Sequence, residues 1–291
     1  MNPLFNLVTM KFPYAQETVC IFMAIQGSMK IRAGPNKANT MHWFHALCRS
    51  TLAGFSGAAF TNIFMGRPTA LFSNDIFFGS CLIGYGLVNW TPFDIGYLAL
   101  KTFVGSFFTT VFAQVFRVGG VAGFSDAAYN AFKENPSDYY PTPVFGPILF
   151  PSMLGNMGGF FGNGVDKYLE KALPWMIQQS VSCSAFYHFY AHDAEGWLGV
   201  TLRSYLKPIA IQIMLLMGAD GKESEDDALF AKFAVGCFMI VMGIVRMDQL
   251  LGPRFSPFMT LSEMVTGVFS GKKKKVNSKP PANKKNKKKN Q

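Results

Sequence analysis

PSMLGNMGGFFGNG, residues 151–164, places several glycines inside a segment that otherwise has the composition of a membrane span. Its small residues Ser152, Gly155, Gly159 and Gly162 recur at intervals of three and four, which puts them on one face of a helix. Each glycine costs about 1 kcal/mol in a helix interior. A helix so rich in glycine therefore packs backbone to backbone, or it bends and opens around something, and both arrangements require a membrane-embedded helix bundle.

A second stretch repeats this pattern. RSTLAGFSGAAFTN, residues 49–62, has small residues at Ser50, Gly54, Gly57 and Thr61. The two glycine-bearing segments lie about a hundred residues apart. This spacing predicts an internal duplication, with the functional helices at matching positions of the two halves.

The composition indicates a membrane protein. Of the 291 residues, 49% are hydrophobic and only 15% are charged, which favours an all-α, polytopic membrane protein over a soluble enzyme. The net charge of +10 is no sign of nucleic-acid binding, because ten of the 27 basic residues lie in the lysine-rich segment 271–291. We therefore predict a transmembrane domain over 1–270 and a disordered, cytosolic tail over 271–291.

Seven apolar segments are predicted to span the membrane. They are residues 17–29 with their flanks, 43–64, 75–90, 97–118, 145–161, 174–190 and 228–247.

The segments between these spans carry further predictions. A glycine-rich run at 119–123 follows a membrane helix instead of a strand, so it is predicted to be a helix C-cap and break, not a phosphate loop. Residues 125–140 are predicted to form a polar loop. Residues 206–217 are apolar but short, which favours an interfacial or re-entrant helix over a span.

The basic residues predict the orientation of the chain. Seven spans put the termini on opposite sides, and the excess of lysine and arginine places the C-terminus in the cytosol and the N-terminus on the lumenal or external side. Lys288 and Lys289, fourth and third from the end, resemble the dilysine signal that returns membrane proteins to the endoplasmic reticulum. The alternative is a polybasic segment attracted to anionic lipids of the cytosolic leaflet.

Few residues carry recognisable site chemistry. Arg49 lies inside an apolar helix, so it should face a wet cavity, a partner or a lipid headgroup, with snorkelling or an internal ion pair as the alternative. The spacings of His42 with His45 and of His188 with His192 could seat a metal, but no third ligand is near, so no metal site is predicted. No triad or carboxylate pair lies on facing helices, so no enzyme is expected.

The order and spacing of several short motifs resemble the trimeric intracellular cation channels of endoplasmic and sarcoplasmic reticulum. The resemblance implies homotrimers of seven-helix subunits, built as two inverted three-helix repeats plus a seventh helix. It also implies a pore in each subunit between kinked second and fifth helices, with the kinks at Gly54, Gly57, Gly158 and Gly159. The motifs are Trp43-Phe44, Gly54 with Gly57, Arg67-Pro68, Ala113-Gln114-Val115-Phe116-Arg117, Val118-Gly119-Gly120-Val121 and Gly158-Gly159.

The chain departs from the family at its lipid motif. The family's fourth helix carries Lys-Glu-Val-x-Arg, whose basic residues hold a phosphoinositide headgroup; here alanine and glutamine, Ala113 and Gln114, replace the lysine and glutamate. Arg117 remains, and an arginine can hold a lipid phosphate through two parallel hydrogen bonds. Arg117 is thus the candidate lipid-binding residue, and a phosphoinositide is the one bound group that we predict. The segment 192–227 is also longer than in the family.

The resemblance implies a potassium and sodium channel that supplies counter-ion flow as calcium leaves or enters the store. Hydroxyls and amides would line its path, which suits weakly selective passage of monovalent ions, because no ring of carboxylates is visible to hold calcium. The candidate pore-lining or kink residues are Arg49, Gly54, Ser56, Gly57, Thr61, Asn156, Gly158, Gly159 and Asn163. A secondary transporter and a non-conducting scaffold are the alternatives.

Overall fold

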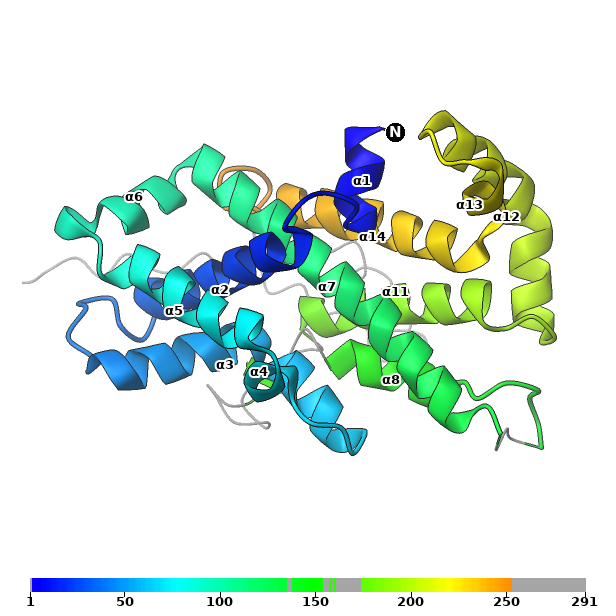
Figure 1. Ribbon diagram of the computed structural model, residues 1–291, viewed down its shortest axis with the longest axis horizontal. Helices are drawn as coiled ribbons and strands as arrows, with labels where there is room; N and C mark the ends of the chain where they lie inside the picture. The colour runs from blue at the N-terminus through cyan, green and yellow to red at the C-terminus, as the bar shows by residue number, and fades with distance from the viewer. Residues whose placement is uncertain (1, 135–137, 154–156, 159, 161–173, 253–291) are drawn as a thin grey trace, which may run out of the picture. The chain divides into compact units, whose positions relative to one another are not determined.

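The computed structural model describes residues 2–134, 138–153, 157, 158, 160 and 174–252, all of which lie in one compact unit, Met1–Phe255. The regular elements of this part of the chain are helices (Figure 1). They are α1 (Pro3–Thr9), α2 (Ala15–Ala33), α3 (Trp43–Phe64), α4 (Ala70–Ser73), α5 (Asp75–Asn89), the 3-10 helix η1 (Pro92–Asp94), α6 (Ile95–Lys101), α7 (Phe103–Phe132), α8 (Phe145–Ser152), α11 (Trp175–Ala191), α12 (Trp197–Leu216), α13 (Gly221–Glu225) and α14 (Asp227–Val245).

Several helices begin and end where the hydrophobic pattern predicts. The predicted segment 43–64 is α3, and α5, α11 and α14 match their segments to within two residues at each end. Polar caps explain two of these starts. Asn74 accepts a hydrogen bond from the backbone nitrogen of Ile76 at 2.9 Å, and Asp226 accepts one from that of Ala228, also at 2.9 Å.

Two predictions about the fourth segment are wrong. Residues 97–118 divide at Thr102 between α6 and α7, and α7 then continues without a break through the glycines at 119–123 to Phe132, where a cap and a polar loop were predicted. One acidic side chain in this stretch, Asp126, has partners on α11 and directly after it. The carboxylate of Asp126 accepts a hydrogen bond from the Tyr187 hydroxyl at 2.9 Å and lies 2.9 Å from Nε2 of His192. These contacts let a polar segment remain helical.

The number of membrane spans is only partly tested. Among the described residues, α7 and α14 are long and apolar enough to cross a membrane. The bent pair formed by α5 with η1 and α6, 85° apart, adds a third candidate if it counts as one span. The seven spans therefore stay a prediction, as does the boundary at residue 270, which lies outside the described residues.

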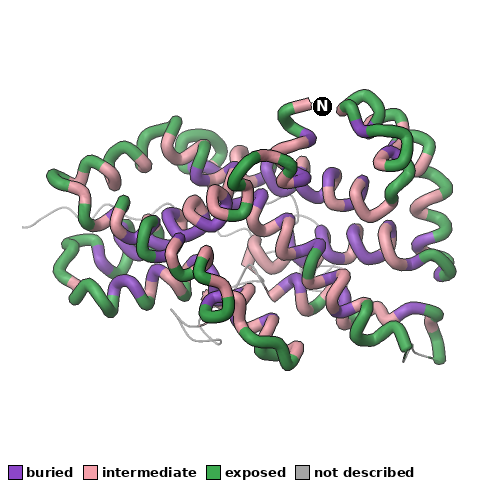
Figure 2. The backbone as a smooth tube through the Cα atoms, viewed as in Figure 1, coloured by how far each residue is buried: buried purple, intermediate pink, exposed green. Residues whose placement is uncertain are grey.

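The helices pack as two groups of three around α2 and α7. The helix α2 packs against α3 and α5, whereas α7 packs against α8 and α11, and the two groups meet where α2 contacts α7. The final helix, α14, packs on α7 and α11. Buried residues lie on the sides of these helices that face one another (Figure 2). The internal duplication and the seventh span stay predictions.

The N-terminal helix α1 is docked on α14. Phe5 and Val8 are fully buried, and the rings of Phe5 and Phe233 lie 5.7 Å apart. The side chain of Val8 fills the space beside Gly236. Lys11, just after α1, forms an ion pair with Glu223 of α13. The start of the described chain is thus fixed to its last helix.

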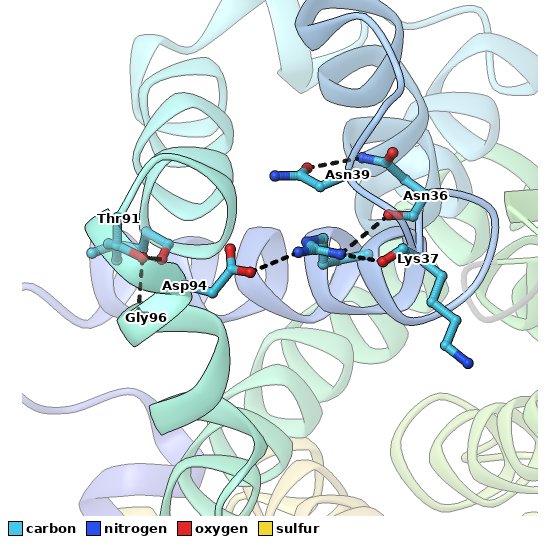
Figure 3. A network of polar contacts seen from close by, with 8 residues as sticks. Asn36, Lys37, Asn39, Thr91, Asp94 and Gly96 are labelled. Atoms are coloured by element: carbon cyan, nitrogen blue, oxygen red, sulfur yellow. Dashed lines mark hydrogen bonds and ion pairs between the residues drawn. The ribbon is translucent and has the colours of Figure 1, made fainter.

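A buried arginine ties the loop after α2 to the turn between α5 and α6 (Figure 3). Arg32 is 7% exposed, and its guanidinium donates to the carbonyl oxygen of Lys37 at 2.6 Å and to the Asp94 carboxylate at 2.9 Å. Asp94 has φ 57°, a left-handed backbone that its ion pair helps to hold.

Candidate ion pathway

The first glycine stretch brings α3 against α2 at backbone distance. A methyl group at Gly27 of α2 would lie 2.9 Å from the backbone nitrogen of Gly54 and closer still to the carbonyl oxygen of Ser50. A methyl group at Gly54 would lie 3.1 Å from the carbonyl oxygen of Met23. The helix α3 runs unbroken through Gly54 and the buried Gly57. Close packing is therefore the role that the structure gives to Gly54, and a kink there stays a prediction.

The second glycine stretch lies against the first. A methyl group at Gly158 would lie 3.1 Å from the carbonyl oxygen of Leu52 and 3.2 Å from the hydroxyl of Ser56, both on α3. The fully buried Thr61 donates a hydrogen bond to the carbonyl oxygen of Phe150 on α8 at 3.2 Å. The two segments singled out in the sequence thus meet in space.

A cavity of about 340 Å³, the glycine cavity, lies between α2, α3, α5 and α7. Three glycines of α7, at positions 119, 120 and 123, line it together with Gly54, so backbone forms much of its wall. Its polar lining comes from Gln16, Asn62, Arg67 and Arg117. Met10, which follows α1, also lines it, and its sulfur lies 3.5 Å from where a Gly119 side chain would begin.

A second cavity of about 410 Å³, the basic cavity, lies between the C-terminal part of α2, the middle of α7 and the end of α14. Lys30, Arg117 and Arg246 line it, together with the amides of Gln26 and Gln114. The guanidinium of Arg246 stacks over the ring of Trp175, 4.5 Å from the ring centroid. Three cationic side chains from three helices therefore converge on one space.

Arg117 lines both cavities and is the residue at which they meet. Its guanidinium donates a hydrogen bond to the side-chain oxygen of Gln26 on α2. Its Nε is buried and has no hydrogen-bond partner among the described residues. An uncompensated N–H of this kind favours an acceptor that enters the cavity.

The charged residues that line the two cavities are all basic among the described residues. Four basic residues line them, Arg67, Arg117, Lys30 and Arg246, whereas no carboxylate does so among the described residues. At about 4 Å, two unit charges interact by about 4 kcal/mol at an effective dielectric constant near 20. The arrangement therefore attracts an anionic group and repels a bare cation unless that group is bound.

Three other predicted pore residues that the structure describes line neither cavity. They are Arg49, which is half-buried on α3, and Gly57 and Thr61, which are buried there. Asn156, Gly159 and Asn163 lie outside the described residues. The pore-lining role of all these residues stays a prediction.

Sequence reasoning missed most of the basic cavity. It identified Arg117 but not Lys30, Gln26 or Arg246, which come from the ends of other helices. The available signal was Lys30 in the last turn of α2 and Arg246 directly after α14, although basic residues also commonly stabilise helix ends. The four histidines gather no set of three possible metal ligands within the part of the chain that the structure describes.

Comparison with known proteins identifies solved structures that share this fold. No protein-family model and no curated protein matches the sequence. The chain is similar to a solved trimeric intracellular cation channel from C. elegans with bound Ca²⁺, at 16% identity and a TM-score of 0.50 over 80% of this chain and 90% of that one. A solved trimeric intracellular cation channel from C. elegans in the absence of Ca²⁺ gives 15% identity and a TM-score of 0.53 over 83% of this chain and 94% of that one. At these identities the similarity establishes a shared fold.

Proposed function

We infer that this chain, which has the fold of the trimeric intracellular cation channels, conducts cations along a path through the glycine cavity and the basic cavity. The observation that carries this inference is that two cavities meet at one residue, Arg117, between helices of the two three-helix groups. Such a path, interrupted at a single side chain, is what a gated pore requires.

Conduction requires the positive charge at the junction to be offset. We propose that a phosphoinositide phosphate enters the basic cavity, where Lys30, Arg117 and Arg246 would donate hydrogen bonds to it. A phosphate monoester carries about −1.5 to −2 charges at neutral pH, enough to balance most of the basic residues there. With that group bound, the hydroxyl and amide lining would face a potential that admits cations.

The finer assignments follow the resemblance. We propose a homotrimer in the endoplasmic reticulum membrane, with its C-terminus in the cytosol, that passes potassium and sodium as counter-ions to calcium fluxes. The absence of carboxylates from the described lining supports monovalent ions, because calcium sites are built from several oxygen ligands with negative charge.

Single-channel recording of the purified protein in planar bilayers that contain a phosphoinositide, with potassium on both sides, tests this function. Discrete current steps are expected, and Arg117→Gln should reduce the current on the order of threefold to tenfold, because it removes a donor to the phosphate that offsets the charge at the junction. The matched control is Lys101→Gln, which removes an exposed charge at the end of α6, away from both cavities. Silence across voltages in folded protein would contradict the proposal.

One observation favours a second candidate, a secondary transporter. The contact between Arg117 and Gln26 separates two cavities, as alternating access requires, and inverted repeats are common in transporters. A transporter would show saturable counterflow of substrate without unitary current steps.

A further inference from the structure

The helix α12 has an uncharged, apolar outer side. Its exposed large residues recur at helical spacing along the whole helix, and the exposed positions between them hold threonine, serine, proline and glutamine. The large exposed residues are Trp197, Val200, Tyr205, Ile209, Leu215 and Leu216. A continuous stripe of this kind on a membrane protein is suited to lipid.

The two basic residues of α12 share one acid. Nη1 of Arg203 lies 3.6 Å from a carboxylate oxygen of Asp227, the first residue of α14, and Nζ of Lys207 lies 3.2 Å from its other oxygen. One carboxylate cannot neutralise two cations, so a net positive charge remains. Nε and Nη2 of Arg203 are also buried and have no hydrogen-bond partner among the described residues.

Arg203 and Lys207 both line a groove. A cavity of about 600 Å³ on α12 is lined by Arg203 and Lys207 together with Val200, Ser204 and Pro208, three residues of the exposed side. The groove therefore joins a positively charged, donor-rich region to the apolar stripe. A molecule that matches both has an anionic head beside an apolar body.

The course of α12 fits a membrane surface. Figure 1 shows α12 running across the ends of α11 and α14 and not alongside them. Because α14 is long and apolar enough to cross the membrane, a helix that runs across its first turn lies along the bilayer surface. Trp197 and Tyr205 are of the two residue types that concentrate at membrane interfaces.

We propose that α12 lies in the membrane interface and that its groove binds the phosphate of a phospholipid headgroup. The positive charges of Arg203 and Lys207 hold the phosphate, and the acyl chains lie along Val200 and Pro208. This site is separate from the basic cavity, and it does not depend on whether the chain conducts ions.

Lipid retention measured by native mass spectrometry tests the site. The full-length protein is titrated with phosphatidylglycerol in detergent, and Arg203→Gln should weaken binding of one lipid per chain on the order of tenfold. Lys222→Gln, which removes an exposed charge from the neighbouring α13, is the matched control and should bind as the wild type does. Equal binding by Arg203→Gln and wild type would overturn the proposal.

A second variant keeps the test sound if Arg203→Gln fails to fold. Ser204→Glu changes an exposed residue that lines the groove and adds a negative charge there, so it should fold and lose the same lipid. Millimolar inorganic phosphate distinguishes the two sources of phosphate: it should not displace the lipid. Displacement, or binding of inorganic phosphate alone, would reveal a free-anion site and overturn the lipid assignment.

The position of α12 is tested by fluorescence in vesicles of brominated phosphatidylglycerol. Trp197, isolated as the difference between wild type and Trp197→Phe, should be quenched by bromines near the headgroup. An unquenched Trp197 would place α12 away from the bilayer and overturn the proposal.

Discussion

At the scale of single residues, Asp193 holds together the region between α11 and α12. It is fully buried, and its carboxylate accepts four hydrogen bonds. The donors are the Tyr140 hydroxyl at 2.5 Å, the Thr142 hydroxyl at 3.0 Å, and the backbone nitrogens of Gly196 at 3.1 Å and Gly199 at 2.9 Å. The two backbone nitrogens belong to the start of α12. One carboxylate therefore holds both the 138–144 loop and the first turn of α12.

Replacing Asp193 by asparagine should destabilise the protein by about 3 kcal/mol, because an amide group would present N–H donors to groups that are themselves donors. The measurement is the denaturation midpoint of the purified protein in detergent. Asp138→Asn, an exposed acid in the same loop, is the control and should leave the midpoint unchanged. If the two variants behaved alike, the network would contribute nothing to stability.

The same network predicts a pH effect. Burial, followed by the hydrogen bond to Asp193, raises the pKa of Tyr140 from 10.0 to about 12. The folded protein therefore retains this phenol proton more tightly than the unfolded chain, so the contribution of Tyr140 to stability is complete below pH 10 and is lost as the pH rises toward 12. In an absorbance titration of tyrosinate, the component that Tyr140→Phe removes should shift to lower pH in Asp193→Asn. A component that stays in place would argue against the coupling.

At the scale of helices, close approach of backbones decides how α2 and α3 pack. Gly27→Ala should destabilise the protein by about 2 kcal/mol, because the added methyl group meets backbone atoms of α3 that no side-chain rotation can move. Gly79→Ala on α5 is the control. No atom lies within 4 Å of that added methyl, so it should be neutral or stabilising by up to about 1 kcal/mol. Thermal denaturation of both variants decides the matter, and equal midpoints would contradict this account.

Helices were predictable from sequence where local pattern decides them. The segment 43–64 matches α3 because its apolar residues and its end before Arg67-Pro68 are local signals. The extension of α7 to Phe132 was not predictable, because Asp126 is stabilised by Tyr187 and His192, which are distant in sequence. The full length of α12 was missed for the same reason: Arg203 and Lys207 made its first half resemble a polar loop until their shared partner, Asp227, was visible.

At the scale of the whole molecule, the candidate pathway forms only when helices distant in sequence pack together. Arg117 could be identified from its motif, yet its meaning depends on Lys30 and Arg246, which arrive from helices at opposite ends of the described chain. The sequence shows a neutral balance of charge before the lysine tail, and only packing reveals that four basic residues line two neighbouring cavities without a described acid.

The proposed homotrimer can be tested by the mass of the purified protein. The protein purified in mild detergent should have three times the mass of one chain by light scattering with the detergent contribution removed, as the solved channels of this fold are trimeric. Arg117→Gln should keep that mass, because Arg117 lies between helices of one chain. A monomer that still conducts would contradict the trimer and leave the pathway intact.

The close approach of Gly27 to Gly54 limits which mutations can compensate for a change at Gly27. When a new side chain clashes with another side chain, a second mutation to a smaller residue can relieve the clash. The residues at the two positions then covary. Here the obstructing atoms are the carbonyl oxygen of residue 50 and the peptide nitrogen of residue 54, which every amino acid supplies. A search for suppressors of a Gly27 variant should therefore return reversion to glycine, or changes far from the contact, but no compensating change at the facing positions.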